Sequence, residues 1–334
     1  MKKYFFYACL LFFIIIGLTA FRFYYFCITP FRSTPPVTAL VTIPEGSSLK
    51  KIAGILETQG LIGEQLWFAL LAKLKKAEHT IKSGDYSINL PLSPVDILEK
   101  LLRGEVILIS MTVPEGSTIF DIARIIENAG FASAESIVQK ATDPLFVKPF
   151  GFDNESLEGF LFPDTYRFRK KTDPEIILSR MATRFKDVFD NEINSIQAER
   201  TLSAREIIIL ASLVEKETPQ PDEKPVIAGV FFNRLKNGMR LECDPTVVYG
   251  VKLEDPLFQG RLRRKHLQKA TPYNTYQIHG LPYGPICNPG LESIRAVLKP
   301  AAVDYLFFVS KNNKTHQFSR TLEEHNSAVR QYQR

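Results

Sequence analysis

The chain has 334 residues, and 42 lysines and arginines against 36 aspartates and glutamates give it a formal net charge of +6. The length suits two domains of ordinary size. The basic excess is modest and spread out, and no arginine-rich arm or zinc-finger spacing accompanies it, so the composition argues against a nucleic-acid-binding protein. The five histidines lack a paired ligand spacing, so we expect no metal site and no cofactor.

The N-terminus predicts a membrane anchor over residues 1–30. An uncharged apolar run follows Lys2 and Lys3, and about 17 to 25 such residues span a bilayer. Its end is a poor match to a small-x-small cleavage site, which favours a retained signal anchor over a removed signal peptide. The two lysines favour a cytoplasmic N-terminus, with the remaining chain on the periplasmic side of the cytoplasmic membrane. A buried hydrophobic hairpin is the alternative.

A short motif occurs twice. Residues 42–57 return as residues 112–127, with about half of the positions identical at an offset of about 70. Each copy predicts a strand, a Pro-Glu-Gly turn, a serine-capped helix and a stop at a glycine, Gly60 or Gly130. This order resembles the opening of a LysM-like module, and such modules bind glycan. A scaffold repeat without a ligand is the alternative.

The first domain is predicted over residues 31–108. Residues 33–36 have the composition of a linker, residues 84–90 predict a strand and residues 95–102 a helix. Together with the first repeat copy they indicate a small mixed fold.

An aromatic segment at residues 157–168 also carries Glu158, Asp164 and Tyr166. It fits an ordinary strand and turn. It also fits a sugar site, because aromatic faces cover the apolar side of a pyranose while carboxylates bind its hydroxyls.

A buried helix is predicted from Glu206 to Thr218, because residues 207–214 are almost all apolar. Glu215 and Glu217 fall in its last turn, where the helix dipole and lost hydration raise a carboxyl pKa. A raised pKa suits a general acid that works near neutrality. The alternative is a solvated charged tip, and the helix pattern alone does not choose between the two glutamates.

The following segments carry further polar side chains. A second helix is predicted between a cap at Asp222 and a stop at Gly238, with Asn233 pointing into the fold or a cleft. A turn is predicted at 244–246, and a long irregular loop at 271–290 is more typical of function than of an idle connection. The C-terminus predicts a hairpin and a final helix.

The ordered motifs resemble one family. They read LASLVEKET, GVFFNRL, GMRLECDPTVVYG, TPYNTY, GLPYGPICNPG, HQFS and EEHN, and in order and spacing they resemble the YceG-like endolytic murein transglycosylases, also called MltG. The resemblance implies an α+β protein made of an N-terminal transmembrane helix, LysM-like small subdomains and a YceG-like catalytic domain over residues 109–334. It implies peptidoglycan glycan strands as substrate, the cytoplasmic membrane as support and cell-wall synthesis machinery as a partner.

The resemblance also implies the chemistry. These enzymes cut between N-acetylmuramic acid and N-acetylglucosamine without water and leave 1,6-anhydro ends, and Glu215 stands at the position of their catalytic glutamate. A single carboxyl acts first as acid and then as base. By chemistry and motif, the candidate substrate-binding residues are Glu158, Asp164, Tyr166, Glu217, Asn233, Asp244, Thr246, Tyr273, Asn274, Tyr276 and Asn288.

Three positions depart from the family pattern. Cys243 and Cys287 stand where small or hydroxyl residues are expected and could form a local disulfide, and Tyr283 replaces a proline. Two other functions stay open: a glycan-binding scaffold without activity, and a muramidase in which a second carboxylate positions water and the products are reducing ends.

Overall fold

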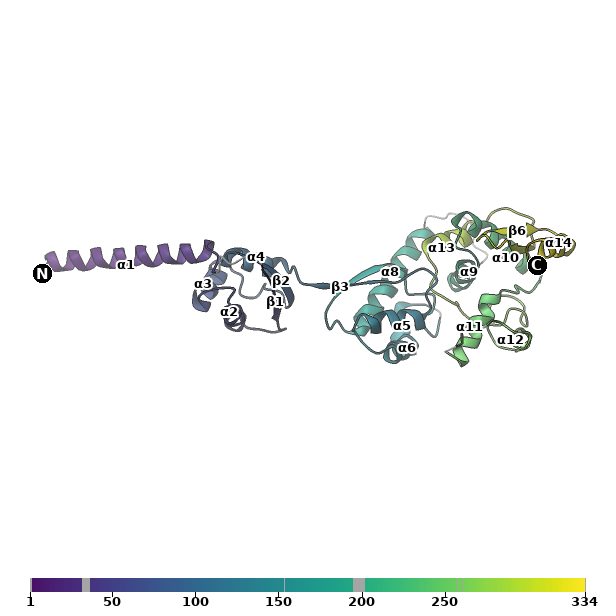
Figure 1. Cartoon of the computed structure of the whole chain (residues 1–334), viewed down its shortest axis with the longest axis horizontal. Coiled ribbons are helices and arrows are strands. Elements are labelled where there is room, and N and C mark those ends of the chain that lie inside the picture. Colours follow the sequence, from purple (N-terminus) through teal and green to yellow (C-terminus); the bar gives the residue numbers. More distant parts are fainter. Residues whose placement is uncertain are drawn as a thin grey trace. The chain divides into compact units, whose positions relative to one another are not determined.

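The protein is a mixed α+β chain, as predicted, and its residues group into two units in the computed structural model (Figure 1). Unit 1 comprises residues 1–109 with 167–170, and unit 2 comprises residues 110–166 with 171–334. The linker predicted at 33–36 lies outside the described residues. The described ranges are 2–31, 37–152, 154–194, 202–256, 258–259 and 261–333.

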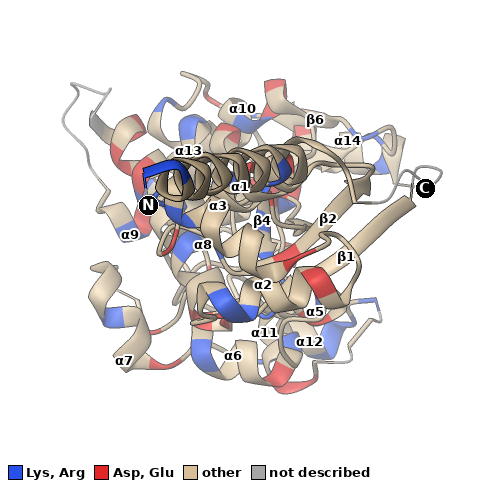
Figure 2. Cartoon of the chain, turned by 90° about the vertical axis from the view of Figure 1, so that its left-hand side faces the viewer, with Lys and Arg blue, Asp and Glu red and all other residues tan. Residues whose placement is uncertain are grey.

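Helix α1 (Lys2–Ile28) is long and apolar enough, by length and composition, to cross a membrane. Figure 2 shows it almost free of charged side chains. Near its C-terminal end, the rings of Phe23 and Phe26 meet Trp67 at 5.8 and 5.6 Å, and Arg22 lies 5.3 Å from the Trp67 ring centroid. The end of α1 therefore packs on the small domain that follows it.

The rest of unit 1 is a two-stranded sheet packed against helices. The strands are antiparallel, and Val41 pairs with Tyr86, whose side chain is fully buried with Leu56, Phe68 and Ile97. The predicted strand at 84–90 and helix at 95–102 are both confirmed. The elements are β1 (Val37–Ile43), α2 (Leu49–Thr58), α3 (Gln65–Leu74), β2 (Gly84–Leu90) and α4 (Pro94–Arg103).

Unit 2 is mostly helical. Strands β3 and β4 pair with each other, β5 and β6 form an antiparallel hairpin, and the division between the units passes through β3 and β4. The elements from β3 onward are β3 (Leu108–Thr112), α5 (Ile119–Asn128), α6 (Ala134–Ala141), α7 (Pro144–Val147), the 3-10 turn η1 (Lys148–Phe150), β4 (Thr165–Arg169), α8 (Pro174–Asn194), α9 (Ala204–Glu217), the 3-10 turn η2 (Pro221–Glu223), α10 (Lys224–Lys236), α11 (Asp244–Glu254), α12 (Arg264–Gln268), α13 (Leu291–Leu298), β5 (Phe307–Ser310), β6 (His316–Ser319) and α14 (Leu322–Tyr332).

Helix α9 is the central element of unit 2. Ser203 and Glu206 form a capping box at its start, and every residue from 207 to 214 is buried. It contacts α10, α11 and α13, so its apolar run is enclosed by other helices. The predicted buried helix is confirmed, and Glu215 and Glu217 follow its apolar run in the last turn.

The two repeat copies form the predicted strand, turn and helix. In the first copy Ser48 caps α2 as predicted; in the second the cap of α5 is Thr118 and not a serine, and its N–H donates in turn to the Asp121 side chain. Gly60 and Gly130 follow the helices with φ values of 68° and 79°, a conformation that glycine adopts without steric cost. The LysM-like assignment of these units stays a prediction.

One local prediction is wrong. The expected turn at 244–246 is the first turn of α11, because Pro245 lacks an N–H where a helix start needs none. The predicted second helix begins one residue later than expected, with Asp222 in the η2 turn and Glu223 at the cap position, and Gly238 follows its end at φ 66°. The C-terminal hairpin and final helix are confirmed.

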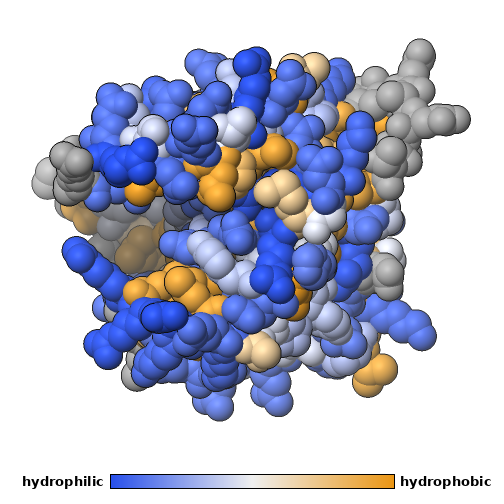
Figure 3. Space-filling view, turned by 90° about the vertical axis from the view of Figure 1, so that its right-hand side faces the viewer, coloured by the Kyte–Doolittle hydropathy of each residue, from blue (hydrophilic) through white to orange (hydrophobic). Residues whose placement is uncertain are grey.

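The face drawn in Figure 3 is mostly hydrophilic, with apolar side chains gathered beside a recess.

Candidate active site

Glu215 is held by four contacts within unit 2. Its two oxygens lie 3.2 Å from Nζ of Lys224, and Oε2 accepts hydrogen bonds from the Gly290 N–H at 2.9 Å and the Ser293 hydroxyl at 2.6 Å. The side chains of Glu215 and Lys224 are 7% and 4% exposed. Donors of the protein therefore engage this carboxylate, which ties α9 to α10 and to the start of α13.

Glu217 lies in a different environment. Burial raises the pKa of the Glu217 carboxyl above its ordinary value, and the charge of Asp244 raises it further. A hydrogen bond with the Cys243 thiol and the proximity of His316 and Arg234 lower it in part. The raised pKa that the sequence predicts for the end of this helix is therefore found at Glu217.

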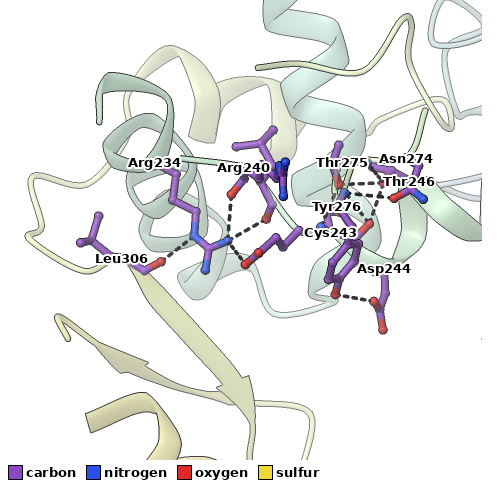
Figure 4. Close-up of polar contacts among 11 residues, drawn as sticks. Arg234, Arg240, Cys243, Asp244, Thr246, Asn274, Thr275, Tyr276 and Leu306 are labelled. Carbon is purple, nitrogen blue, oxygen red and sulfur yellow. Dashed lines mark hydrogen bonds and ion pairs between the residues drawn. The ribbon is translucent and has the colours of Figure 1, made fainter. Parts of the chain in front are cut away.

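A buried network fixes the Cys243 thiol beside Glu217. The Cys243 N–H donates to Oγ1 of Thr275 at 2.9 Å, and the Thr246 hydroxyl donates to the Cys243 carbonyl at 2.7 Å (Figure 4). The two threonine hydroxyls lie 2.9 Å apart. Cys243, Thr246 and Thr275 are all buried, so these hydrogen bonds hold the start of α11 against the 271–276 segment.

Arg234 holds the turn that leads into this network. Its Nε donates to the Leu306 carbonyl at 2.6 Å, and its Nη1 donates to the Arg240 and Leu241 carbonyls at 3.1 and 3.0 Å (Figure 4). Nη1 also lies 3.2 Å from Oε2 of Glu242, whose φ is 49°. Arg234 is not among the residues predicted from the sequence. The feature that could have indicated its role is an arginine inside a largely apolar helix.

His316 and Glu223 fix the other side of the helix end. Oε2 of Glu223 lies 2.7 Å from Nδ1 of His316 and accepts from the Thr218 hydroxyl at 3.2 Å, while the His316 N–H donates to Oε1 at 2.8 Å. Strand β6 is therefore tied to the residue that follows Glu217. Glu223 carries no motif signal, because its closest partner, His316, lies 93 residues along the chain.

Of the predicted substrate-binding residues, four gather here. Glu217, Asp244 and Thr246 lie at the end of α9 and the start of α11, and the Tyr276 hydroxyl donates to Oδ1 of Asp244 at 2.7 Å. We call Glu217, Cys243, Asp244, Thr246 and Tyr276 the Glu217 cluster. Nearby, Nδ2 of Asn274 donates to three backbone carbonyls, of His266, Leu267 and Lys269, at 3.2, 3.0 and 2.7 Å, so its amide supports the loop.

Glu158 and Asn288 belong to a second, internal group. Glu158 is 2% exposed and accepts from the Ile119 N–H at 3.1 Å, the Tyr249 hydroxyl at 3.0 Å and Nδ2 of Asn288 at 3.1 Å. Burial raises the pKa of Glu158 to about 8, although these donors oppose the shift. Asn288 also accepts from the Leu161 N–H at 2.7 Å, so it joins separate segments of unit 2.

A pocket of about 560 Å³ opens next to Glu158. We call it the tyrosine pocket, because Tyr249, Tyr273 and Tyr283 line it. The ring centroids of Tyr249 and Tyr273 are 4.9 Å apart, and those of Tyr273 and Tyr283 are 6.3 Å apart. Among the predicted sugar contacts, Glu158 and Tyr273 therefore border a cavity.

The remaining predicted contacts are engaged elsewhere. Asp164 forms an exposed ion pair with Arg184 at 3.3 Å, and the buried Tyr166 hydroxyl donates to the Phe162 carbonyl at 2.6 Å. Nδ2 of Asn233 donates to the carbonyls of residues 303 and 305 at 2.7 and 3.0 Å. These side chains hold the fold in place.

The cysteines are free, so Cys243 and Cys287 do not form the local disulfide that the sequence allowed. The Cys287 thiol donates instead to the Ser212 carbonyl at 3.3 Å. Among the residues that the structure describes, no group of three or more His, Cys, Asp or Glu side chains is placed to hold a metal ion.

Three comparisons relate the chain to known proteins. The model of the YceG-like family matches residues 41–331. An endolytic murein transglycosylase of Bacillus subtilis (strain 168) is 33% identical over 322 residues, which cover 91% of this chain and 87% of the relative. An endolytic murein transglycosylase of Streptococcus pneumoniae serotype 2 (strain D39) is 30% identical over 298 residues, which cover 81% of this chain and about half, 54%, of that relative.

A solved structure agrees with these matches. The 2.6 Å crystal structure of a putative yceG-like protein from Listeria monocytogenes shares 30% sequence identity with this chain. The comparison has a TM-score of 0.58 and covers 88% of this chain and 100% of the other. The family match spans both units and includes the Glu217 cluster. This chain therefore belongs to the YceG-like family.

Proposed function

We propose that this protein is an endolytic lytic transglycosylase that cleaves the β-1,4 bond between N-acetylmuramic acid and N-acetylglucosamine in peptidoglycan strands and leaves 1,6-anhydro ends. The names of the Bacillus and Streptococcus relatives support this activity. The observation that carries the chemistry is the raised pKa of Glu217 at the end of the buried helix α9. A carboxyl that keeps its proton toward neutral pH is what the first step requires.

We assign the acid role to Glu217 and not to Glu215, which the family resemblance favoured. The oxygens of Glu215 are engaged by Lys224, Gly290 and Ser293, so a substrate would have to displace contacts that join three helices. Glu217 has a raised pKa and belongs to a polar cluster at the start of α11. The Glu215 assignment is the alternative that the experiment below tests.

The proposed reaction uses one carboxyl twice. Glu217 first gives its proton to the glycosidic oxygen, and the bond from that oxygen to C1 of the muramyl ring breaks. The substrate's 2-acetamido group relieves the positive charge that forms at C1. The Glu217 carboxylate then takes the proton of the muramyl O6 hydroxyl while O6 bonds to C1, which restores the acid and closes the anhydro ring.

The surroundings of Glu217 suit both halves of this cycle. Burial and the Asp244 charge favour the protonated form before bond cleavage. The Cys243 thiol and the nearby Arg234 and His316 favour the carboxylate that remains afterwards. The net effect is a raised pKa of Glu217, which favours the protonated form that the first step uses.

We also propose that α1 anchors the enzyme in the cytoplasmic membrane, with Lys2 and Lys3 on the cytoplasmic side and the chain after α1 outside. The length and composition of α1 support this location. An anchor would keep the enzyme on the membrane that also holds the cell-wall synthesis machinery, where new glycan strands are found.

The test uses the full chain in detergent micelles with purified peptidoglycan, and mass spectrometry of the released fragments. We compare the wild type with Glu217→Gln and Glu215→Gln, and circular dichroism confirms that each variant is folded. Anhydro ends from the wild type and from Glu215→Gln, but not from Glu217→Gln, would support the proposal. Activity lost in Glu215→Gln and retained in Glu217→Gln would return the acid role to Glu215.

The same fragments separate the other functions. Reducing ends in place of anhydro ends would show a muramidase that uses water. Binding without cleavage by any of the proteins would show a glycan-binding scaffold.

A further inference from the structure

The tyrosine pocket shares two elements with the Glu217 cluster. Helix α11 starts at Asp244 in the cluster and carries Tyr249 to the pocket, and at about 1.5 Å per residue these two positions are about 7.5 Å apart along the helix axis. The 271–276 segment likewise contributes Tyr276 to the cluster and Tyr273 to the pocket. The pocket and the Glu217 cluster are therefore built on the same helix and the same segment.

The pocket has the size and the walls of a ligand site. Its volume of about 560 Å³ lies within the usual range for small-ligand pockets, about 300 to 1,000 Å³. The rings of Tyr249, Tyr273 and Tyr283 supply apolar faces, and Asn154 and Glu155 supply polar groups. Aromatic faces beside a few hydrogen-bonding side chains suit a sugar ring, whose CH groups and hydroxyls need both.

The charged residues of the pocket wall favour a neutral ligand over an anionic one. Glu155 and Glu158 line the pocket, while no lysine or arginine is among its described lining residues. The Tyr249 hydroxyl is already bonded to Glu158. An anionic group would meet the Glu155 side chain with no cation among the described lining residues, so a neutral ring is favoured over a phosphate or a sugar acid.

Tyr283 is the most exposed of the three tyrosines in this wall, at 48%. By the family resemblance it stands where a proline is expected. The Arg205 guanidinium lies 5.5 Å from its ring centroid, and its own N–H donates to the Pro272 carbonyl at 3.0 Å. A hydrogen bond between its hydroxyl and Glu155 fixes the ring from the other end.

We propose that the tyrosine pocket is an outer subsite that binds one neutral N-acetylhexosamine ring of the glycan strand, and that Tyr283 forms its rim. This inference rests on the proposed function, because the strand that fills the pocket is the one cleaved at Glu217. Tyr283 positions the strand and does not touch the reacting atoms. It therefore acts on substrate binding and leaves the chemical step unchanged.

The test separates binding from chemistry. In the full-length Glu217→Gln background, we measure binding of tetra-N-acetylchitotetraose by calorimetry, with and without Tyr283→Ala. Removal of the ring is expected to weaken binding about tenfold, which corresponds to about 1.4 kcal/mol. Tyr283→Phe keeps the ring and is expected to stay close to the parent protein.

Kinetics with peptidoglycan supply the second measurement. In the otherwise wild-type chain, Tyr283→Ala is expected to raise KM about tenfold while kcat stays within about twofold and the products keep their anhydro ends. The matched control is Tyr305→Ala, because Arg320 lies 5.7 Å from the Tyr305 ring centroid and Tyr305 is not among the residues that line the pocket. It should leave both constants unchanged.

The outcomes are distinct. If Tyr283→Ala binds and cleaves like the wild type and the Tyr305→Ala control, the subsite proposal is overturned while the proposed function stands. If the wild type makes no anhydro ends, the proposed function fails, and the calorimetry alone decides whether the pocket binds the ring.

Discussion

Glu215 and Glu217 leave the same helix two residues apart and enter different surroundings. Residues at i and i+2 do not share a helix face. Glu215 meets Lys224 and Ser293, whereas Glu217 faces the start of α11 with its Cys243 thiol. One short motif thus supplies a carboxylate that joins helices and a carboxyl with a raised pKa.

Loss of Glu215 is expected to destabilise unit 2. In Glu215→Gln, the ammonium of Lys224, 4% exposed, loses its close partner, because Glu115 lies 3.9 Å away and is itself half exposed. Removing one member of a buried pair costs about 3 kcal/mol or more of unfolding free energy. Chemical denaturation followed by circular dichroism measures this change.

The control for that change is Glu292→Gln, which removes an exposed ion pair with Arg295 and should alter the unfolding free energy by less than about 0.5 kcal/mol. The double variant Glu215→Gln/Lys224→Met removes the buried ammonium as well, leaves only the half-exposed Glu115 without its partner, and should recover part of the loss. Equal stability of Glu215→Gln and the wild type would contradict the structural role of this pair.

Two variants should move the pH profile of cleavage in opposite directions. The Asp244 charge raises the pKa of Glu217, so Asp244→Asn should lower that pKa and shift the alkaline limb of kcat/KM to lower pH. The Cys243 thiol favours the Glu217 carboxylate, so Cys243→Ala should raise the pKa and shift the limb to higher pH. Rates of fragment release across pH measure both shifts.

The comparison is informative because both side chains lie beside Glu217, and a general disturbance of the site would lower activity without moving the limb. Cys243→Ser, which restores a hydroxyl donor, should return the profile toward that of the wild type. Shifts of the same sign in Asp244→Asn and Cys243→Ala would rule out Glu217 as the titrating acid.

Glu158 should make the fold less stable as pH rises. Its pKa is raised from 4.5 to about 8 in the folded chain. Between these values the folded state holds the proton and the unfolded state releases it, so the unfolding free energy falls as pH increases across this window. Denaturant titrations from pH 4 to pH 9 should show the decline.

Glu158→Gln supplies the control for this prediction. The glutamine keeps an acceptor for the Ile119 N–H and offers a donor to the Tyr249 hydroxyl, but it cannot ionise. The fall in stability over the window should therefore become shallower in the variant. An unchanged slope would mean that Glu158 does not bind its proton more tightly in the folded state.

Local sequence signals predicted the helices well, because their causes are local. The capping box of Ser203 and Glu206, the apolar run after it and the glycine stop at Gly238 each act within a few residues. The surroundings of Glu215 and Glu217, in contrast, depend on residues far along the chain. Gly290 and Ser293, more than 70 positions along the chain, engage Glu215 and distinguish it from Glu217.

The partners of the asparagine side chains could not be predicted from the sequence either. Asn233, Asn274 and Asn288 were predicted as sugar contacts because amides bind hydroxyls, but an amide serves a backbone carbonyl equally well. Only the folded chain decides which partner is present. The role of Arg234 could not be predicted from the sequence, because its partners are backbone carbonyls and these leave no motif.

Asn288 gives a direct test of this distinction. Asn288→Ala removes the acceptor of the Leu161 N–H and a donor to Glu158, and leaves the Ser117 carbonyl without the amide. Buried groups left unpaired in this way cost about 1 to 3 kcal/mol each, so the unfolding free energy should fall clearly. The KM of the folded fraction for peptidoglycan should not change, because the side chain is fully buried.

Thermal and chemical unfolding measure the stability, and initial rates over a range of peptidoglycan concentrations measure KM. The matched control is Asn326→Ala on the exposed side of α14, which should change the unfolding free energy by less than about 0.5 kcal/mol. A raised KM in Asn288→Ala with unaltered stability would instead place this amide in the sugar-binding cleft, as the sequence motif alone suggests.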